Sequence, residues 1–260
     1  MANLRRVLQY TILVGVMFSM RHLSRAQSTR GLPNHEVSSV VPFVGCKSDG
    51  QVGPLGAPKG NGETVQISAE KAQRLAYYKA EQGWGVLAPR GWYCFETYGS
   101  NGESLFVSPQ PIGADNLFSR SWKGFTGPAI QISCESGGTS GRFGVARMIA
   151  RVFPAHRDFV RKVIAEGVER ASDFPFGPYP KDKLRYKSNE MVEYRTPSRT
   201  KGLGTDSRLL EDVDPIRGVA VLVGPDTDLA FLAVRLLGAM SHLVPTIVEQ
   251  LERETAAITR

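Results

Sequence analysis

Serine and lysine stand at a spacing that can support covalent catalysis. Ser68 and Lys71 fit the pattern Ser-x-x-Lys, in which a lysine one helical turn away can activate a serine at the start of a helix. The same spacing recurs at Ser198 and Lys201, and neither copy is accompanied by the Ser-Asp-Asn or Lys-Thr-Gly elements that complete such sites. We therefore expect Ser68 to cap a helix rather than to attack a substrate.

A glycine-rich loop at residues 137–144 has the composition of an anion-binding loop. It places Ser140 and Arg142 just before a predicted helix, and the N-terminus of a helix favours negative charge. The loop lacks both the Gly-Lys-Ser/Thr ending of a phosphate-binding loop and the spacing of a dinucleotide-binding fingerprint. It is predicted to be a surface loop, with Ser140 and Arg142 as candidate binding residues.

Histidines and acidic residues lack the spacing of metal ligands. His35, His156 and His242 are far apart in the chain, so neither a metal nor another cofactor is expected. Acidic pairs such as Asp226 and Asp228 lie in polar turns. They could serve glycoside hydrolysis only if the fold held two carboxyl groups about 5–9 Å apart across a cleft.

Aromatic residues are concentrated in residues 77–125, which hold about half of those in the chain. Most of them should fill the core of a sheet. Trp84 and Trp122 are flanked by glycine or polar residues and are expected to be more exposed. They are candidate binding residues, able to stack on a sugar or a peptide.

The elements that would hold these residues follow from local patterns. A helix is predicted from Ser68 to Gln82, two more end at Val152 and Glu166, and the last one covers residues 244–257. Strands are predicted at 85–88, 92–98, 104–108, 128–134, 183–187, 190–196, 218–223 and 229–236. Helices mixed with hairpins indicate an α+β fold, with a mostly antiparallel sheet packed with three to four helices.

The N-terminus has the pattern of an export signal. Arg5 and Arg6 precede an apolar stretch that is shorter than the ~20 residues needed to span a bilayer, and Ser24-Arg25-Ala26 suits cleavage before Gln27. We expect a signal peptide at 1–26, an extended and partly disordered lead-in at 27–62, and a single α+β domain at 63–260. Export to the periplasm or beyond follows, and a retained membrane anchor is the alternative.

Charge and cysteine content fit this localisation. The chain has 32 Lys+Arg and 25 Asp+Glu, a net charge of +7, and cleavage would remove four arginines and leave +3. A nucleic-acid partner is therefore not expected. Outside the cytoplasm, disulfides persist, and we predict a Cys46–Cys94 bond that leaves Cys134 free and buried; three reduced thiols are the alternative.

One segment resembles a known family. The order of strands and turns at residues 85–108, with Pro89, Gly91 and Trp92 in the first turn, resembles the opening of PsbP-like domains. More broadly, the chain resembles uncharacterised exported bacterial proteins. The PsbP-like resemblance implies an α/β/α sandwich with the helix pair at 142–167 as an insertion. It also implies a role in binding or assembly rather than catalysis. The missing catalytic motifs and the aromatic segment favour an envelope glycan or protein as partner. An envelope hydrolase with a serine-based or carboxylate-based site is the alternative.

Overall fold

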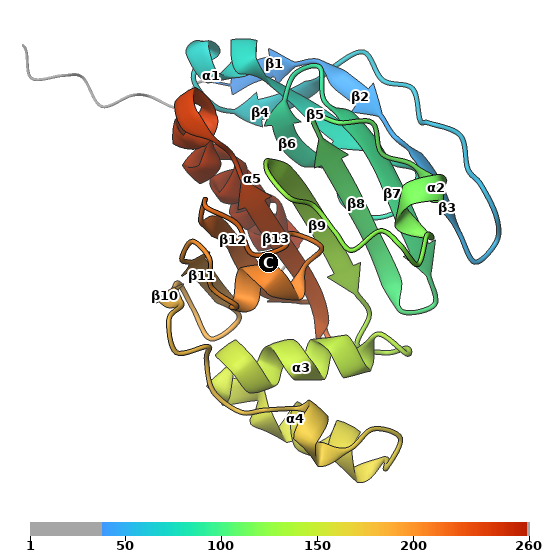
Figure 1. The fold of residues 1–260 in the computed structure, drawn as a ribbon, viewed down its shortest axis with the longest axis vertical. Coiled ribbons are helices and arrows are strands. Elements are labelled where there is room, and N and C mark those ends of the chain that lie inside the picture. The colour runs from blue at the N-terminus through green and yellow to red at the C-terminus, as the bar shows by residue number, and fades with distance from the viewer. Residues whose placement is uncertain (1–37, 259–260) are drawn as a thin grey trace, which may run out of the picture. The chain divides into compact units, whose positions relative to one another are not determined.

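An eight-stranded sheet forms the centre of the domain (Figure 1). The computed structural model describes residues 38–258, which belong to one compact unit, Glu36–Arg260. In order across the sheet, the strands are β10 (Lys183–Tyr186), β11 (Met191–Thr196), β12 (Ile216–Val223), β13 (Asp228–Arg235), β9 (Ala129–Glu135), β8 (Gly102–Ser108), β7 (Tyr93–Gly99) and β3 (Lys47–Gly50). Only β3 and β7 pair in parallel. The predicted mostly antiparallel sheet is confirmed.

Smaller sheets and helices surround this centre. β1 (Ser38–Val41) pairs with β4 (Glu63–Gln66), and β5 (Leu75–Lys79) lies between β2 (Phe43–Gly45) and β6 (Val86–Pro89). The described α-helices are α1 (Ala69–Arg74), α2 (Ala114–Leu117), α3 (Arg142–Val152), α4 (Arg157–Ala165) and α5 (Val244–Ile258). The α+β class is confirmed, since helices and hairpins are mixed along the chain. No helix among the described residues combines the length and the apolar character needed to cross a bilayer.

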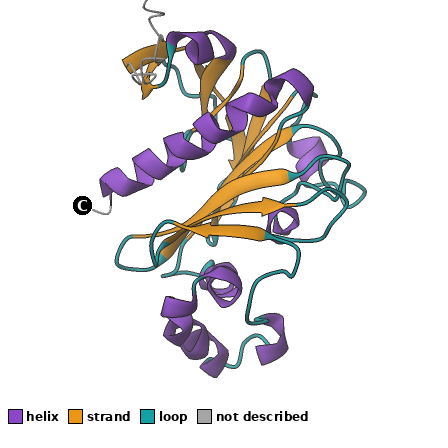
Figure 2. Ribbon diagram, turned by 90° about the vertical axis from the view of Figure 1, so that its left-hand side faces the viewer, coloured by secondary structure: helices purple, strands orange, loops and turns teal. Residues whose placement is uncertain are grey.

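The central sheet is covered on both faces (Figure 2). Successive side chains of a strand point to opposite faces, so on β13 Leu232 enters one hydrophobic core and Phe231 the other. The first core lies under α5 and the strands β5 and β6, and the second under α3 and α4. Burial on both faces explains why β12 and β13 are almost continuously apolar in sequence.

The predicted helix from Ser68 to Gln82 is wrong beyond its first turns. Ser68 does cap α1, its hydroxyl accepting a hydrogen bond from the Lys71 amide at 3.5 Å, but the helix ends at Arg74. The following run, Leu75 to Tyr78, is buried throughout and pairs with both β2 and β6. A run that is buried on every side suits a strand inside a sheet better than an amphipathic helix.

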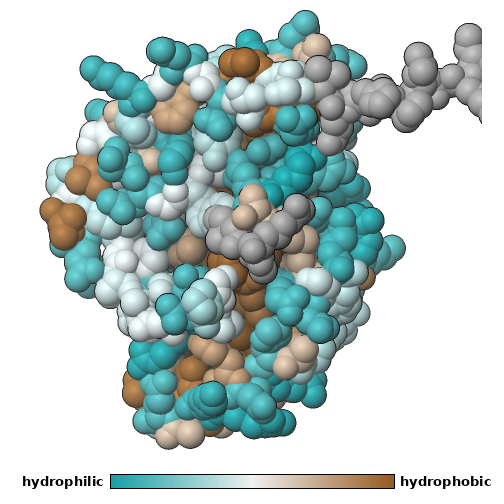
Figure 3. All heavy atoms as spheres, turned by 180° about the vertical axis from the view of Figure 1, so that it is seen from behind, coloured by the Kyte–Doolittle hydropathy of each residue, from teal (hydrophilic) through white to brown (hydrophobic). Residues whose placement is uncertain are grey.

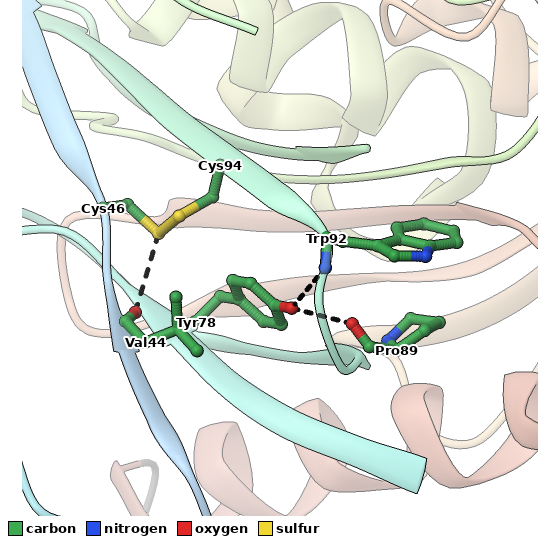
Figure 4. The surroundings of a disulfide bond; sticks show 6 residues. All are labelled: Val44, Cys46, Tyr78, Pro89, Trp92 and Cys94. Carbon is green, nitrogen blue, oxygen red and sulfur yellow. Dashed lines mark hydrogen bonds between the residues drawn. A yellow bond between two sulfur atoms is a disulfide. The ribbon is translucent and has the colours of Figure 1, made fainter. Parts of the chain in front are cut away.

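The segment from residue 43 to residue 50 joins two sheets. Its first part, β2, runs parallel to β5, and its second part, β3, runs parallel to β7. Cys46 lies between the two parts and is bonded to Cys94 on β7, with an S–S distance of 2.01 Å, so the predicted disulfide is present (Figure 4). Residues 38–50 of the expected lead-in are therefore strands of the domain. The predicted signal peptide and the rest of the lead-in before residue 38 lie outside the described residues.

Tyr78 holds the turn on which the family resemblance rests. Its hydroxyl donates to the Pro89 carbonyl at 2.7 Å and accepts from the Trp92 amide at 3.1 Å (Figure 4). Gly91 in this turn has φ +79°, a conformation that favours glycine. Pro89, Gly91 and Trp92 thus have a structural role here.

The third cysteine is a free thiol. Cys134 lies on β9 and is half-buried rather than fully buried. Burial, followed by the neighbouring carboxylates of Glu103 and Asp228, raises its pKa to about 12. A thiol with such a pKa is almost entirely protonated at neutral pH, so Cys134 is a poor nucleophile.

Candidate functional site

The two tryptophans proposed as binding residues are structural in part and lie apart. Trp122 is half-buried and makes an edge contact with Phe125, with ring centroids 5.1 Å apart. Trp84 is also half-buried and packs against the core under α5, whereas Trp122 packs against the core under α3. The sheet separates these cores, so the structure does not bring Trp84 and Trp122 into one site.

Ser140 and Arg142, the two candidate binding residues of the glycine-rich loop, both interact with other residues of the protein. Ser140 Oγ lies 3.2 Å from Ser100 Oγ. Arg142 donates to Glu166 through Nε at 2.9 Å and through Nη2 at 2.7 Å, which occupies the fork of its guanidinium. Glu166 raises the pKa of Arg142 through this hydrogen bond. The loop therefore presents no free guanidinium for an anion.

A cavity of about 320 Å³ between α3 and the sheet gathers charged groups from four parts of the chain. Glu135 ends β9, while Arg147 and Arg151 lie one turn apart on the same face of α3. Asp173 ends a short 3₁₀ turn, Ala171–Asp173, and Tyr179 follows it, while Asp206 ends another such turn, Leu203–Asp206. Apolar side chains complete the walls: Met148, Pro175, Leu229 and Phe231. We call this the Glu135 cavity.

Glu135 is the most perturbed carboxyl group in the cavity. Burial raises its pKa to about 7, although the positive charge of Arg147 acts in the opposite direction. Gly144 of α3 makes room for it, because a Cβ at position 144 would lie 1.5 Å from Glu135 Oε2. Near neutral pH, Glu135 is therefore present in both its acid and its carboxylate form, and it can donate or accept a proton.

Asp206, Tyr179 and Arg151 form a connected group on the other side. The Tyr179 hydroxyl donates to Asp206 Oδ1 at 2.7 Å, and the Arg151 guanidinium lies 4.1 Å from the centre of the Tyr179 ring. Arg151 also donates to the Gly177 carbonyl at 3.2 Å. Burial, followed by the hydrogen bond to Asp206, raises the pKa of Tyr179 to about 12, so its proton stays in place at neutral pH. These contacts hold the polar groups in fixed positions.

A second hollow of about 240 Å³ shares Glu135 with the first. It is lined by the ends of β7 and β8, including Thr97, Asn101 and Ser104. Ser104 Oγ lies 2.8 Å from Ser133 Oγ on β9, which continues the polar surface along the sheet. Glu135 therefore stands between two polar hollows.

The groups in the Glu135 cavity define what it can do. None of the described residues that line it is a serine, a cysteine or a histidine, so it offers no such nucleophile. The described part of the chain also holds no group of three or more His, Cys, Asp or Glu residues placed to bind a metal. Hydrogen bonding, ion pairing and proton transfer by carboxyl groups remain as the chemistry of this site.

Sequence reasoning missed this cavity because its residues come from distant segments. The nearest signal is the pair Arg147 and Arg151, which falls on one face of a predicted helix, while Glu135 directly follows the strand predicted at 128–134. Comparison with known proteins adds no further candidate, since no protein-family model, no curated protein and no solved structure matches the chain.

Proposed function

We propose that this chain is an exported, non-catalytic binding domain and that the Glu135 cavity is its ligand site. The observation that carries the proposal is the convergence of Glu135, Asp206, Arg147 and Arg151 on one hollow. A concave site with a few convergent polar groups and a perturbed pKa is typical of a binding site. The Cys46–Cys94 disulfide supports export, because such bonds persist mainly outside the cytoplasm.

The lining favours a polar ligand without a large net charge. Three carboxyl groups, those of Glu135, Asp173 and Asp206, and two guanidinium groups supply acceptors and donors, while Phe231 and Met148 supply an apolar wall. The Arg147 guanidinium also pairs with Glu169, so Arg151 is the less engaged of the two arginines. The volume lies at the low end of the ~300–1,000 Å³ range for small-molecule sites, which suits a short fragment. An envelope glycan or a peptide segment of an envelope protein has this chemistry, and a binding role agrees with the PsbP-like resemblance.

Calorimetric titration with two panels of ligands, muropeptides and β-1,4-linked N-acetylglucosamine oligomers, tests the proposal. At least one of them should bind saturably, and Arg151→Met should weaken that binding at least tenfold by removing a donor from the wall. Glu166→Gln is the matched control, because Glu166 pairs with Arg142 outside the cavity. The proposal would be contradicted if Arg151→Met and the wild type bound these ligands with equal affinity, or if the wild type bound no ligand of either panel.

A carboxylate-based hydrolase is the second candidate, favoured by one observation. A carboxyl group with a pKa of about 7 is suited to act as a general acid or base at neutral pH, and Glu135 is such a group. Incubation of the same panel with the protein would then release products, with a rate that changes around pH 7. Glu135→Gln should abolish this turnover and leave binding in place, whereas a pure binding domain shows no turnover in either form.

A further inference from the structure

Three cationic residues lie in a row across the face of the sheet that is opposite to the Glu135 cavity. Lys183 on β10 is directly opposite Arg195 on β11, and Arg195 is directly opposite Arg217 on β12. Directly opposite residues of an antiparallel pair point to the same face, with Cβ atoms about 4.5–5.5 Å apart. Like charges on directly opposite residues destabilise a sheet, and an anion bound between them would relieve this. We call these three residues the cation row.

The neighbouring row shows what the cation row lacks. There Arg185 is opposite Glu193, and the two side chains form an ion pair that Lys187 joins at 2.8 Å. Within the described part of the chain, no hydrogen bond or ion pair is recorded for the side chains of the cation row. Arg195 Nε is buried there without a hydrogen-bond partner. A buried donor of this kind is costly until it is paired.

The cation row lines a groove of about 400 Å³ beside the first turns of α5. Val244, Pro245 and Val248 form an apolar wall on the helix side. The start of α5 adds the positive end of a helix dipole. Glu249 also lines the groove, and Glu193 is held by Arg185 and Lys187, so the cations exceed the acids.

We propose that this groove binds a single-chain amphiphile with an anionic head group, such as an alkyl phosphate or a fatty acid. The head group pairs with Arg195 and Arg217, where it separates like charges and satisfies the buried Arg195 Nε. The tail lies along Val244, Pro245 and Val248. The volume is near the low end of the ~300–1,000 Å³ found for small-molecule sites, which suits one chain rather than two.

This site is independent of the Glu135 cavity. The cation row lies on the face of the sheet covered by α5, and the Glu135 cavity lies on the face covered by α3. Loss of one activity therefore leaves the other intact, and the two proposals fail separately.

The experiment is calorimetric titration of the full domain with dodecyl phosphate below its micellar concentration. Inorganic phosphate supplies the head group alone, and dodecyl maltoside supplies the same tail without charge. Dodecyl phosphate should bind at least tenfold more tightly than either, and its affinity should fall as NaCl is raised, because the pairing is ionic. The double variant Arg195→Gln/Arg217→Gln should lower the affinity at least tenfold. Arg161→Gln, on the exposed surface of α4, is the matched control and should bind like the wild type.

Three results would overturn the proposal. These are equal binding of dodecyl maltoside, unchanged affinity of the double variant, and tighter binding of an octaglutamate peptide, which would make the groove a protein-docking surface. If the melting temperature of the double variant is at or above that of the wild type, its weaker binding is not caused by unfolding. If the double variant is less stable than the wild type, the affinity of the single variant Arg217→Gln, at an exposed position, is compared with that of the wild type instead.

Discussion

The Glu135 carboxyl group occupies the place that a side chain at position 144 would take. An ideal Cβ on Gly144 would lie 1.5 Å from Glu135 Oε2, which no pair of real atoms tolerates. The glycine is within α3, where it has no advantage for the helix itself. At this position it leaves room for the Glu135 carboxyl group against the helix.

Gly144→Ala should therefore destabilise the protein. Inside a helix this change normally adds about 0.5–1 kcal/mol of stability. Here the end of the Glu135 side chain has to rotate away from the new methyl group, which should outweigh that gain and leave a net loss of up to about 1 kcal/mol. Urea unfolding of the variant measures the sign. Gly56→Ala is the control, since a Cβ there meets nothing within 4 Å and should leave stability nearly unchanged. A more stable Gly144→Ala variant would show that Glu135 does not depend on this space.

Glu96 should make stability depend on pH. It is fully buried on β7, and neither carboxyl oxygen has a hydrogen-bond partner of good geometry. Burial, with the nearby Glu103 carboxylate, raises its pKa to about 8. The positive charge of Lys79 and a weaker contact with the Gln82 amide favour the charged form but do not offset the burial. Because the folded protein holds this proton more tightly than the unfolded chain, the free energy of unfolding should fall as the pH rises from about 4.5 to 8. Each pKa unit is worth about 1.4 kcal/mol, so the loss is at most about 5 kcal/mol.

The variant Glu96→Gln tests this dependence. Glutamine copies the shape of the protonated acid, so the variant should match or exceed the wild type in stability at pH 8 and show a flatter profile between pH 5 and pH 8. Glu81→Gln, at an exposed position, should retain the wild-type profile. A steep profile that survives in Glu96→Gln would assign the effect to other groups, Glu135 first among them.

The disulfide should contribute substantially to stability. It closes a loop of 48 residues, and on the chain-entropy model such a bond is worth about 3–4 kcal/mol. Cys46→Ser/Cys94→Ser should lower the free energy of unfolding by that amount, measured by urea unfolding. The wild type in reductant should behave alike, and Cys134→Ala should remain sensitive to reductant. If reductant leaves the wild type unchanged, the bond has no such role.

Arg217→Gln and Arg185→Gln should change stability in opposite directions. The first removes one charge from the cation row and should stabilise the free domain by roughly 0.2–1 kcal/mol. The second removes the partner of Glu193 from the adjacent row and should destabilise it. Thermal unfolding at low and high salt checks both, and salt should shrink each difference. Destabilisation by Arg217→Gln would mean that this arginine already has a stabilising partner.

Much of the fold could be predicted from sequence, and the errors have physical causes. Turns marked by glycine and asparagine located the hairpins, and β7, β8, β12 and β13 lie within two residues of the predicted ends. The strands before residue 80 were missed because β2 and β3 are short and β5 follows a helix without a turn residue between them. Long-range pairing with β7, rather than local preference, makes Lys47–Gly50 a strand.

The site was harder to predict than the fold. Ser140 and Arg142 were chosen from their local sequence, but they interact with Ser100 and Glu166, respectively. These partners are distant in sequence, so no local pattern reveals them. Glu135 has no motif around it, and its pKa depends on burial by segments far along the chain. The cation row depends on strand register, which aligns Lys183, Arg195 and Arg217 only after β10, β11 and β12 have paired.

The surface seen from behind is mainly hydrophilic, with some hydrophobic residues in a central strip and others scattered towards its edges (Figure 3). Protection of sheet edges matters for such a domain, because an open strand invites pairing with another molecule. β10 ends the sheet on one side as a short strand that carries Lys183 and Arg185. On the other side, β3 covers β7, and the bond from Cys46 holds it there. The disulfide thus ties β3 to the aromatic strand β7, which lies inside the sheet rather than at its edge. We expect its reduction to loosen β3 and to promote association between copies of the chain.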